Sequence, residues 1–213
     1  MANRYDIINF LSKTYYDHDC SYLEIGTEYP QNCFDLILSK KKTSVDPSKI
    51  SADVKIDYLM TSDNFFSDLE DGKTEFTKDF KWDIIFIDGL HLAEQVYKDI
   101  QNAVKHCSGF IILHDCAPSN FYNAHSDYEF FQKNRHEWNG STWKAFYKYR
   151  TETNLKTYTI YTDHGLGVID INKTTKPIQL ENPWFEFGKF KQNMKHDLNL
   201  ISVDEFVNMH KRG

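Results

Sequence analysis

Two short segments each carry an aspartate and a histidine at the exit of an apolar run. Asp88 and His91 follow the run that ends at residue 87, and His114 and Asp115 follow the run that ends at residue 113. Carboxylate oxygens are the ligands that a hard divalent cation prefers, and two neighbouring strands can supply them together. Alternatively, each pair caps the helix or loop that follows it. Because the same composition occurs twice, the pattern favours a metal site that contains Asp88 and Asp115.

A second group of residues has the chemistry to bind a cofactor. Glu24 and Gly26 stand at the end of the apolar segment 21–26. A glycine there lets the backbone turn tightly and approach a ligand, and an acid just before it can bind an amine. The sequence has one glycine where the GxGxxG motif has three, which argues against NAD and FAD. An ordinary strand-to-helix turn would leave the same pattern.

Two later strand ends extend this candidate cofactor site. Asp46 lies twenty positions after Gly26, where we expect an exposed end of the next strand. At this spacing an acid can bind two ribose hydroxyls. Alternatively, an aspartate before Pro47 is simply a good turn former. Ser62 and Asp63 follow the next predicted strand, where they either face the adenine of a bound nucleoside or cap a helix.

These residues can act together only if a sheet brings the strand ends to one edge. The runs at 82–88 and 109–114 are continuous enough for strands that are buried on both faces. Between them, apolar residues recur every four positions over 92–106, which predicts a helix with one buried stripe. Further strands are predicted at 21–26, 43–47, 56–60, 157–162 and 167–171, and further helices around 7–11, over 34–38 and from 62 onward.

This order predicts an α/β protein with a single Rossmann-like, doubly wound and mostly parallel seven-stranded sheet and a closing antiparallel hairpin. Residues 1–213 form one predicted domain, because this length leaves little room for a second. Within it, 1–20 is an N-terminal helix, 117–139 a lid or insertion, and 177–213 a C-terminal helical tail with a capping box at 202–205. We expect the tail to pack on the domain or on a second copy of the chain in a homo-oligomer.

Composition argues against several other classes of protein. The net charge of −6 has the wrong sign for a protein that binds the phosphate backbone of nucleic acids. No apolar run approaches the roughly 20 residues that span a bilayer, and the first residues do not resemble a signal peptide. The 4 cysteines form no CxxC pair. We therefore expect a cytoplasmic protein that binds neither nucleic acid nor membrane.

Residues 22–171 resemble the class I S-adenosylmethionine (SAM)-dependent methyltransferases. More narrowly, they resemble the branch of small bacterial methyltransferases related to metal-dependent sugar O-methyltransferases. The segments that carry the resemblance keep the order of the family along most of the chain. They are YLEIG at 22–26, VDP at 45–47, SDNFF at 62–66, FIDGLH at 86–91, LHDCAP at 113–118, WNGSTWK at 138–144 and DHGLGV at 163–168.

The resemblance implies that SAM binds across the ends of the first strands, with Gly26 beneath it and Asp46 on its ribose. In metal-dependent relatives, including catechol and macrolide-sugar O-methyltransferases, the fourth strand ends in an aspartate that binds Mg²⁺. A basic residue three positions later serves as the general base. These roles fall on Asp88 and His91, and the ligand from the fifth strand falls on Asp115.

The chain departs from these relatives at the next ligand. They add a carboxylate or an amide beside the aspartate of the fifth strand, whereas this sequence has His114 before Asp115 and Cys116 after it. Both are poorer ligands for Mg²⁺ than an oxygen donor. His114 is therefore the remaining candidate for a third metal ligand.

Together these features lead to a hypothesis of metal-assisted O-methylation of a hydroxyl on a small molecule or glycosyl unit. A divalent cation, Mg²⁺ or another, lowers the pKa of a bound hydroxyl, and a histidine with an unperturbed pKa near ~6.5 can accept its proton. Two alternatives use the same residues: a metal-dependent hydrolase, and a SAM-binding module without turnover. No segment identifies the acceptor.

Overall fold

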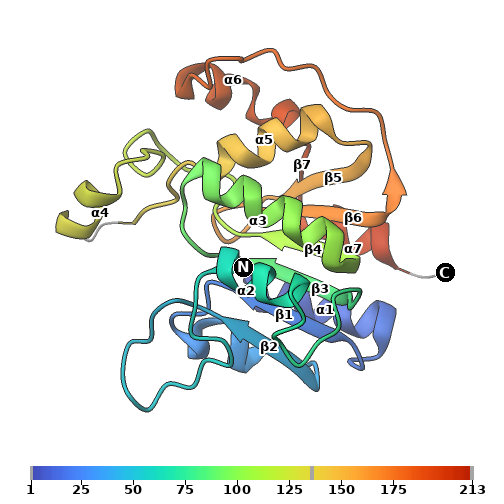
Figure 1. The fold of residues 1–213 in the computed structure, drawn as a ribbon. Coiled ribbons are helices and arrows are strands. Elements are labelled where there is room, and N and C mark those ends of the chain that lie inside the picture. Colours follow the sequence, from blue (N-terminus) through green and yellow to red (C-terminus); the bar gives the residue numbers. More distant parts are fainter. Residues whose placement is uncertain (1, 135–136, 212–213) are drawn as a thin grey trace.

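The computed structural model describes residues 2–134 and 137–211, which fold into one sheet flanked by helices (Figure 1). The elements follow one another as α1 (Arg4–Tyr16), β1 (Ser21–Ile25), the 3₁₀ turns η1 (Pro30–Asn32) and η2 (Phe34–Leu36), β2 (Lys41–Val45), α2 (Ser62–Glu70), β3 (Trp82–Ile87), α3 (Ala93–His106), β4 (Cys107–Leu113), α4 (Tyr128–Asn134), α5 (Thr142–Glu152), β5 (Leu155–Ile160), β6 (Leu166–Thr174), α6 (Phe187–Asp197), β7 (Leu200–Ile201) and α7 (Val203–His210).

The seven strands lie in the order β2-β1-β3-β4-β6-β5-β7. Strands β2, β1, β3 and β4 run parallel to one another, β6 is antiparallel to both β4 and β5, and β7 pairs in parallel with β5. The predicted mostly parallel sheet with a closing antiparallel hairpin is confirmed. Strand order reverses between β1 and β3, and ligands of such sheets bind outside the carboxyl ends of the strands at this point.

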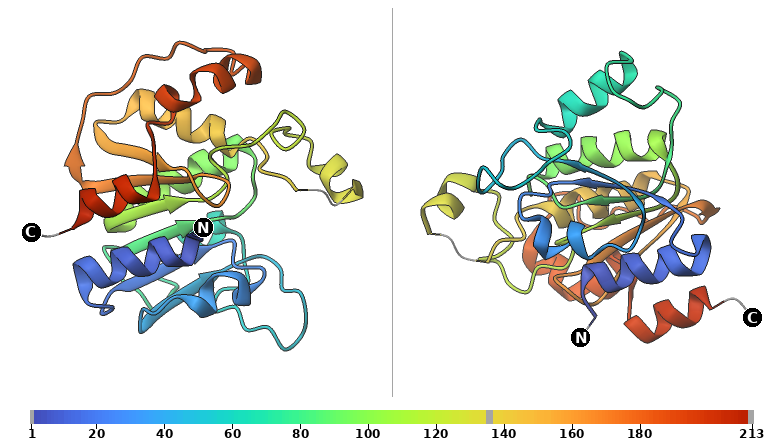
Figure 2. Two further views of the ribbon diagram at one scale, coloured as in Figure 1. Left: turned by 180° about the vertical axis from the view of Figure 1, so that it is seen from behind. Right: turned by 90° about the horizontal axis from the view of Figure 1, so that it is seen from below.

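Alternation along the strands divides the core into two layers. Leu23 and Ile85 point to the face covered by α2, α3, α5 and α6, whereas Tyr22 and Ile84 point to the face covered by α1 and α7. Figure 2 shows these helices on opposite sides of the sheet. Because both faces are buried, the central strands read as continuous apolar runs in the sequence.

Two predicted elements are wrong, and both lie on the β2 side of the sheet. Residues 56–60 form no strand, and only Tyr58 makes an isolated bridge, to Val45. The Asp57 carboxylate accepts hydrogen bonds from the backbone N–H and the hydroxyl of Ser44, donors at the outer edge of β2 where a further strand would pair. The seventh strand of the sheet is β7, from the C-terminal tail.

The helix predicted over 34–38 is the second wrong element. The structure has only η2 there, directly after η1, and the segment is too short to repay the cost of nucleating an α-helix. Leu36 and Leu38 are exposed instead of packing on the sheet. The carbonyls of Phe34 and Ile37 accept hydrogen bonds from the Lys42 ammonium group, which stabilises this irregular backbone.

The C-terminal tail packs on its own domain. Phe190 of α6 stacks on Trp143 of α5 with ring centroids 4.1 Å apart, and Phe206 of α7 contacts Phe10 of α1. The predicted capping box is present, since the Ser202 side chain accepts a hydrogen bond from the Glu205 backbone and the Glu205 carboxylate accepts one from the Ser202 backbone. The tail therefore extends both the sheet and the two core layers.

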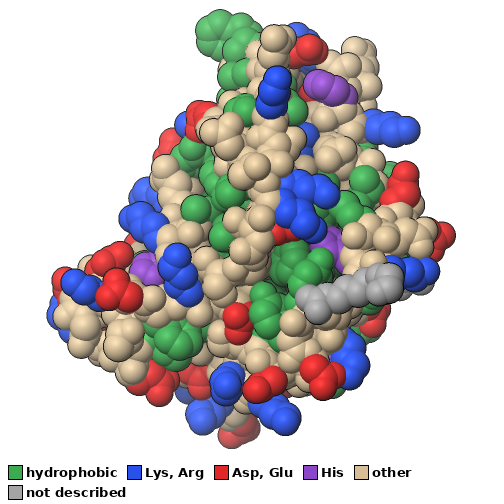
Figure 3. Space-filling model, turned by 90° about the vertical axis from the view of Figure 1, so that its right-hand side faces the viewer, with side chains coloured by type: hydrophobic (Ala, Val, Ile, Leu, Met, Phe, Trp, Pro, Cys, Tyr) green, Lys and Arg blue, Asp and Glu red, His purple; other side chains and the backbone are tan. Residues whose placement is uncertain are grey.

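The surface of the described residues carries charges of both signs. Acidic and basic side chains are interspersed over the face shown in Figure 3, with apolar side chains between them. Within 2–134 and 137–211, no helix combines the length and the apolar character needed to cross a bilayer. All four cysteines are buried and free.

Candidate active site

A cavity of about 610 Å³ lies at the carboxyl ends of β1, β2 and β3. It is bordered by the strand-end loops, by the start of α2 and by aromatic side chains of the segment 117–139. The parallel strands bring to this one cavity all the residues predicted to bind a cofactor and two of those predicted to act on the acceptor. These residues are Glu24, Gly26, Asp46, Ser62, Asp63, Asp88 and His91.

Gly26 is the turn residue at the end of β1. Its φ is +89°, in the left-handed region that favours glycine, and a Cβ at this position would lie 2.2 Å from the carbonyl oxygen of Asp88. No larger residue fits without displacing the end of β3. Gly26 thus lets the β1 turn pack directly against the strand end that carries Asp88.

Glu24 is a buried acid on the cavity wall, only 2% exposed. The Tyr22 hydroxyl donates a 2.5 Å hydrogen bond to its carboxylate. Burial raises the pKa of Glu24 to about 8, although the hydrogen bond from Tyr22 works in the opposite direction. A cation entering the cavity beside Glu24 would stabilise the charged carboxylate, as the predicted binding of an amine requires.

Asp46 lies at the end of β2 and organises two loops. Its Oδ2 accepts a 2.9 Å hydrogen bond from the Glu28 backbone, and its Oδ1 accepts bonds from the Ser48 backbone and hydroxyl at 2.8 and 3.0 Å. The side chain is buried, so the expected exposed strand end is wrong. Because a carboxylate oxygen has two lone pairs, Oδ2 can still accept a further hydrogen bond from a ligand.

Ser62 and Asp63 open α2, but Thr61 is its N-cap, and its side chain accepts a hydrogen bond from the Asn64 backbone. The Ser62 hydroxyl donates a 2.6 Å hydrogen bond to Asp99 of α3 instead. Burial raises the pKa of Asp99 to about 6. Asp99 lines the same cavity, and the sequence offered no signal for it, because its partner lies on another helix.

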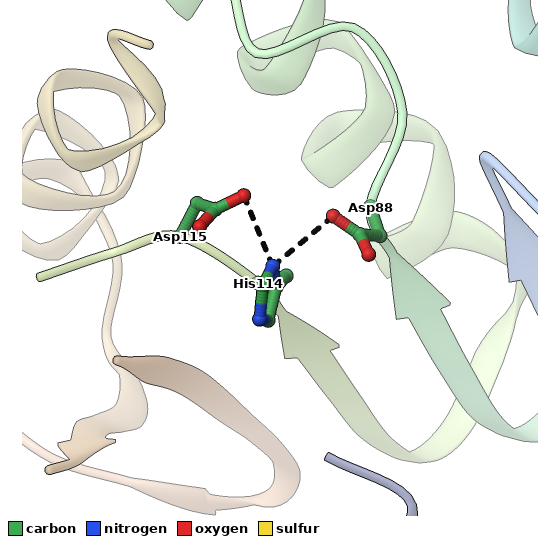
Figure 4. A group of neighbouring side chains, drawn as sticks. All are labelled: Asp88, His114 and Asp115. Atoms are coloured by element: carbon green, nitrogen blue, oxygen red, sulfur yellow. Dashed lines mark ion pairs between the residues drawn. The ribbon is translucent and has the colours of Figure 1, made fainter. Parts of the chain in front are cut away.

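Four side chains meet where β3 and β4 end. The Nδ1 atom of His114 lies 3.2 Å from Oδ1 of Asp88 and 3.0 Å from Oδ2 of Asp115. Figure 4 shows the imidazole between the two carboxylates. The Nε2 atom of His91 lies 3.3 Å from each of the same two oxygens. Asp88, His114 and Asp115 are also spaced to hold a metal ion, with one ligand atom of each within 4.8 Å of the others.

The atoms of the two carboxylates that face away from this cluster are held from outside. Arg4 of α1 donates a 2.5 Å hydrogen bond from Nη1 to Oδ2 of Asp88. Asn139 donates a 2.5 Å hydrogen bond from Nδ2 to Oδ1 of Asp115. Each carboxylate therefore has one anchored oxygen and one that faces the histidines.

Each of the two imidazoles is likewise held by a contact between its outer nitrogen and a residue outside the cluster. Nδ1 of His91 contacts the backbone carbonyl of Trp138 at 3.0 Å, and Nε2 of His114 contacts Oδ1 of Asp163 at 3.3 Å. Trp138 also stacks on His91, with ring centroids 5.4 Å apart. If the outer nitrogen of each ring carries the proton, the inner nitrogens Nε2 of His91 and Nδ1 of His114 present lone pairs to the carboxylates.

Charge compensation dominates the electrostatics of the cluster. Burial favours the neutral acids, but the His114 imidazole holds the pKa of Asp88 and of Asp115 below the usual range. Burial also opposes protonation of the histidines, yet Asp115 and Asp88 raise the pKa of His91 and of His114. The cluster thus stabilises positive charge among its carboxylates, and a bound divalent cation would supply such charge.

Several contact residues were missing from the sequence-based site. Arg4, Asn139 and Asp163 come from α1, from the loop before α5 and from the β5–β6 turn, far along the chain from Asp88. Their roles depend on tertiary contacts that no local pattern encodes. Asn139 and Asp163 do lie in segments that resembled the methyltransferases, but that resemblance assigned them no role.

Comparison with known proteins places the fold. No family model matches the chain, and no curated protein matches it. Among solved structures, an O-methyltransferase from Bacillus cereus in complex with S-adenosylhomocysteine (SAH) is similar, with a TM-score of 0.54 and 16% identity over 77% of this chain and 79% of that one. The chain thus has a methyltransferase fold, and the resemblance to SAM-dependent methyltransferases is confirmed at the level of the fold.

The mycinamycin-pathway methyltransferase MycE gives weaker matches. Its complex with Mg, SAH and mycinamycin VI has a TM-score of 0.47 and 13% identity, and covers 91% of this chain. Its complex with Mg and SAH has a TM-score of 0.46. The chain spans little more than half of MycE, at 56% and 54% of its length in the two complexes.

Proposed function

We propose that this chain is a SAM-dependent methyltransferase that uses a divalent cation to methylate a hydroxyl oxygen of a small molecule or glycosyl unit. One observation carries the proposal. Two buried acids at neighbouring strand ends, Glu24 and Asp46, line the same cavity as Asp88 and His91. The methyltransferase fold, with SAH bound in a structure that shares it, is consistent with this arrangement.

The cofactor half of the cavity is the part that Glu24, Gly26 and Asp46 form. SAM supplies a methyl group on a sulfonium, together with an ammonium group and two ribose hydroxyls. In this proposal Glu24 pairs with the ammonium group, and the remaining lone pair on Oδ2 of Asp46 accepts a hydrogen bond from a ribose hydroxyl. Gly26 leaves the floor between them without a side chain.

The acceptor half is the part near Asp88 and His91. Asp88, His114 and Asp115 are the residues that would hold a divalent cation, and such a cation lowers the pKa of a bound hydroxyl and orients it. The fit rests on the inner atoms of these side chains, which lie within 4.8 Å of one another, and on the outer contacts that hold them.

His91 is the proposed general base. Its side chain is 20% exposed and lines the cavity, whereas that of His114 is 5% exposed and does not. Its Nδ1 is engaged by the Trp138 carbonyl, so Nε2 is the atom that can accept a proton from the acceptor. The same carbonyl contact and the stacked Trp138 ring hold the imidazole in place.

Methyl transfer from SAM to a panel of phenols, polyols and glycosides, with and without a chelator, tests this proposal. We expect transfer that the chelator lowers and a divalent cation restores. Full transfer in excess chelator would contradict the role of the metal. Binding of SAH without transfer to any acceptor would favour the binding module, and ester hydrolysis without SAH binding would favour the hydrolase.

A further inference from the structure

His114 puts a nitrogen into a ligand set that otherwise offers only oxygen. We propose that His114 binds the cation through Nδ1, oriented by Asp163 and Arg4, and that the site therefore prefers a transition-metal dication such as Mn²⁺, Fe²⁺, Co²⁺ or Zn²⁺ to Mg²⁺. The inference rests on the proposed function, because it concerns the metal site assigned there.

The first observation is that the Nδ1 atom of His114 lacks a hydrogen bond. It is buried and has no hydrogen-bond partner among the described residues. The two carboxylate oxygens lie within 3.2 Å of it, but neither contact has the direction of a hydrogen bond. A buried polar atom without a hydrogen bond is costly, and a cation that displaces the proton from Nδ1 would bind its lone pair together with the two carboxylates.

The second observation is the contact on the other side of the ring. Nε2 of His114 lies 3.3 Å from Oδ1 of Asp163. Histidines that bind metals almost always donate the other ring N–H to a carboxylate or a carbonyl, which fixes the tautomer and leaves the first nitrogen free to coordinate. The Asp163–His114 pair has this arrangement, and its free nitrogen faces Asp88 and Asp115.

Asp163 is in turn fixed by the N-terminal helix. The Arg4 backbone N–H and Nε donate to Oδ2 of Asp163 at 2.8 and 3.0 Å, and Nη2 donates to Oδ1 at 3.2 Å. The same guanidinium holds the outer oxygen of Asp88. One residue of α1 therefore orients two of the three ligand side chains, and Asp163 acts as a positioning residue.

The ligand chemistry then decides which metal the site takes. Mg²⁺ keeps oxygen ligands and near-ideal octahedral geometry, and it is bound by carboxylates and water. Imidazole suits Zn²⁺ and Fe²⁺, whereas Mn²⁺ shares the preference of Mg²⁺ for oxygen ligands. Mn²⁺ is nevertheless the softer of these two ions and binds a nitrogen ligand more readily than Mg²⁺ does. A set of one imidazole nitrogen and two carboxylate oxygens therefore shifts the preference toward transition metals.

Substitution of His114 by aspartate gives a sharp test. In both side chains the ligand atom is two bonds from Cβ, so Oδ1 of the aspartate can take the place of Nδ1. Metal-free protein is titrated with Mn²⁺ alone and with Mn²⁺ in competition with Mg²⁺, and pulsed electron paramagnetic resonance detects nitrogen bound to Mn²⁺. His196→Gln on α6 is the matched control, because its imidazole is 63% exposed and lies outside the cluster.

We expect nitrogen coupling in the wild-type protein and in the His196→Gln control. The His114→Asp variant should lose that coupling, and its preference for Mn²⁺ over Mg²⁺ should fall on the order of tenfold. Wild-type Mn²⁺ without nitrogen coupling would overturn the inference, as would an unchanged preference in His114→Asp. Because Nε2 of His91 also lies 3.3 Å from both carboxylate oxygens, coupling that persists in His91→Gln assigns the nitrogen to His114 even if His114→Asp does not fold.

Asp163→Asn tests the orientation of the imidazole. It keeps the size of the side chain but removes the charge that favours the required tautomer, so Mn²⁺ should bind about 10–100-fold more weakly at a temperature at which circular dichroism shows the metal-free variant to be folded. Unchanged Mn²⁺ affinity would contradict the claim that Asp163 and Arg4 orient His114 for metal binding. None of these measurements needs SAM or an acceptor, so the metal inference and the methyltransferase proposal can fail separately.

Discussion

In the proposed cofactor site, the carboxyl group of Glu24 sets the pH range in which the cavity can pair with an ammonium group. Burial raises the pKa of Glu24 to about 8, so the free protein holds it mainly protonated at pH 7. Pairing with the ammonium group of SAM or SAH needs the charged carboxylate. Affinity should therefore rise as the pH increases from 6 toward 8, and binding near pH 7 should release a proton.

Calorimetry with SAH in buffers of different ionisation enthalpy measures this proton release directly. The Glu24→Gln variant keeps the shape of the side chain but cannot titrate, so its weaker binding should lose both the proton release and the rise with pH. A wild-type affinity that is flat between pH 6 and 8 would exclude Glu24 as the partner of the ammonium group.

Asp46 should contribute to both cofactor binding and stability. Because its carboxylate accepts three hydrogen bonds from the neighbouring loops, Asp46→Ala should lower the free energy of unfolding by about 1–3 kcal/mol. It should also weaken SAH binding by a comparable amount. Chemical denaturation and calorimetry give the two values, and the exposed Asp53→Ala is the control for the same loop. Normal SAH affinity in Asp46→Ala would reject the ribose contact.

His91 should affect turnover and leave the cofactor in place. Loss of a general base lowers the rate by roughly 10²–10⁴-fold, so His91→Gln should show this drop with SAH affinity unchanged. The Mn²⁺ affinity of the same variant separates two roles. If it falls as much as in His114→Asp, His91 is a metal ligand instead of the base.

At the residue scale, the sequence was sufficient to predict the site residues that follow the strands. It was not sufficient to predict the residues whose side chains hold those site residues in position. Asp88 and Asp115 follow long apolar runs, so their common edge could be predicted from the strand pattern. Arg4 and Asp163 touch each other although 159 positions separate them, and neither has a local signal. The exposure of Asp46 was wrong for the same reason, since the Glu28 loop that covers it is irregular.

At the element scale, the turn after β1 and the end of β3 form one packed unit. Gly26→Ala should be destabilising because its Cβ would clash with the Asp88 backbone and its φ is positive. Gly72→Ala is the matched control, since Gly72 also has a positive φ but has nothing within 4 Å of a Cβ. Overpacking costs typically 1–3 kcal/mol, so Gly26→Ala should unfold more easily than Gly72→Ala by about that amount.

Comparison of the same two variants also tests whether the turn after β1 contributes to the proposed cofactor site. Gly26→Ala should weaken SAH binding, whereas Gly72→Ala should not, because Gly26 lines the cavity and Gly72 does not. Equal melting temperatures and equal SAH affinities in the two variants would show that the β1 turn tolerates a side chain, contrary to the packing described here.

The elements differ in how far the sequence could predict them. Strands β3 and β4 are buried on both faces and were predicted within two residues of their ends. The edge of the sheet beside β2 was harder to predict, because segment 56–60 has the composition of a strand. Only the contact of Asp57 with Ser44 shows why this segment does not pair with β2. Strand β7 is two residues long, and its pairing with β5 depends on where α6 and α7 pack.

At the scale of the whole molecule, the site is assembled from both halves of the chain. The parallel strands bring the residues of the proposed cofactor site to one edge of the sheet, and α1, the loop before α5 and the β5–β6 turn close around the cluster (Figure 1). Contacts between such distant segments mean that the cluster at the ends of β3 and β4 depends on the tertiary fold of the chain from Arg4 to Asp163. Ligand binding should therefore stabilise the domain as one unit.

The most direct test of the central claim is the binding of SAH to the intact protein, with NAD as the control ligand. Calorimetry should show SAH binding, and SAH at 100 times its Kd should raise the free energy of unfolding by about 2.7 kcal/mol. NAD should do neither, because the single-glycine turn at Gly26 lacks the dinucleotide motif. Binding of NAD without binding of SAH would contradict the assignment of this cavity to a methyl donor.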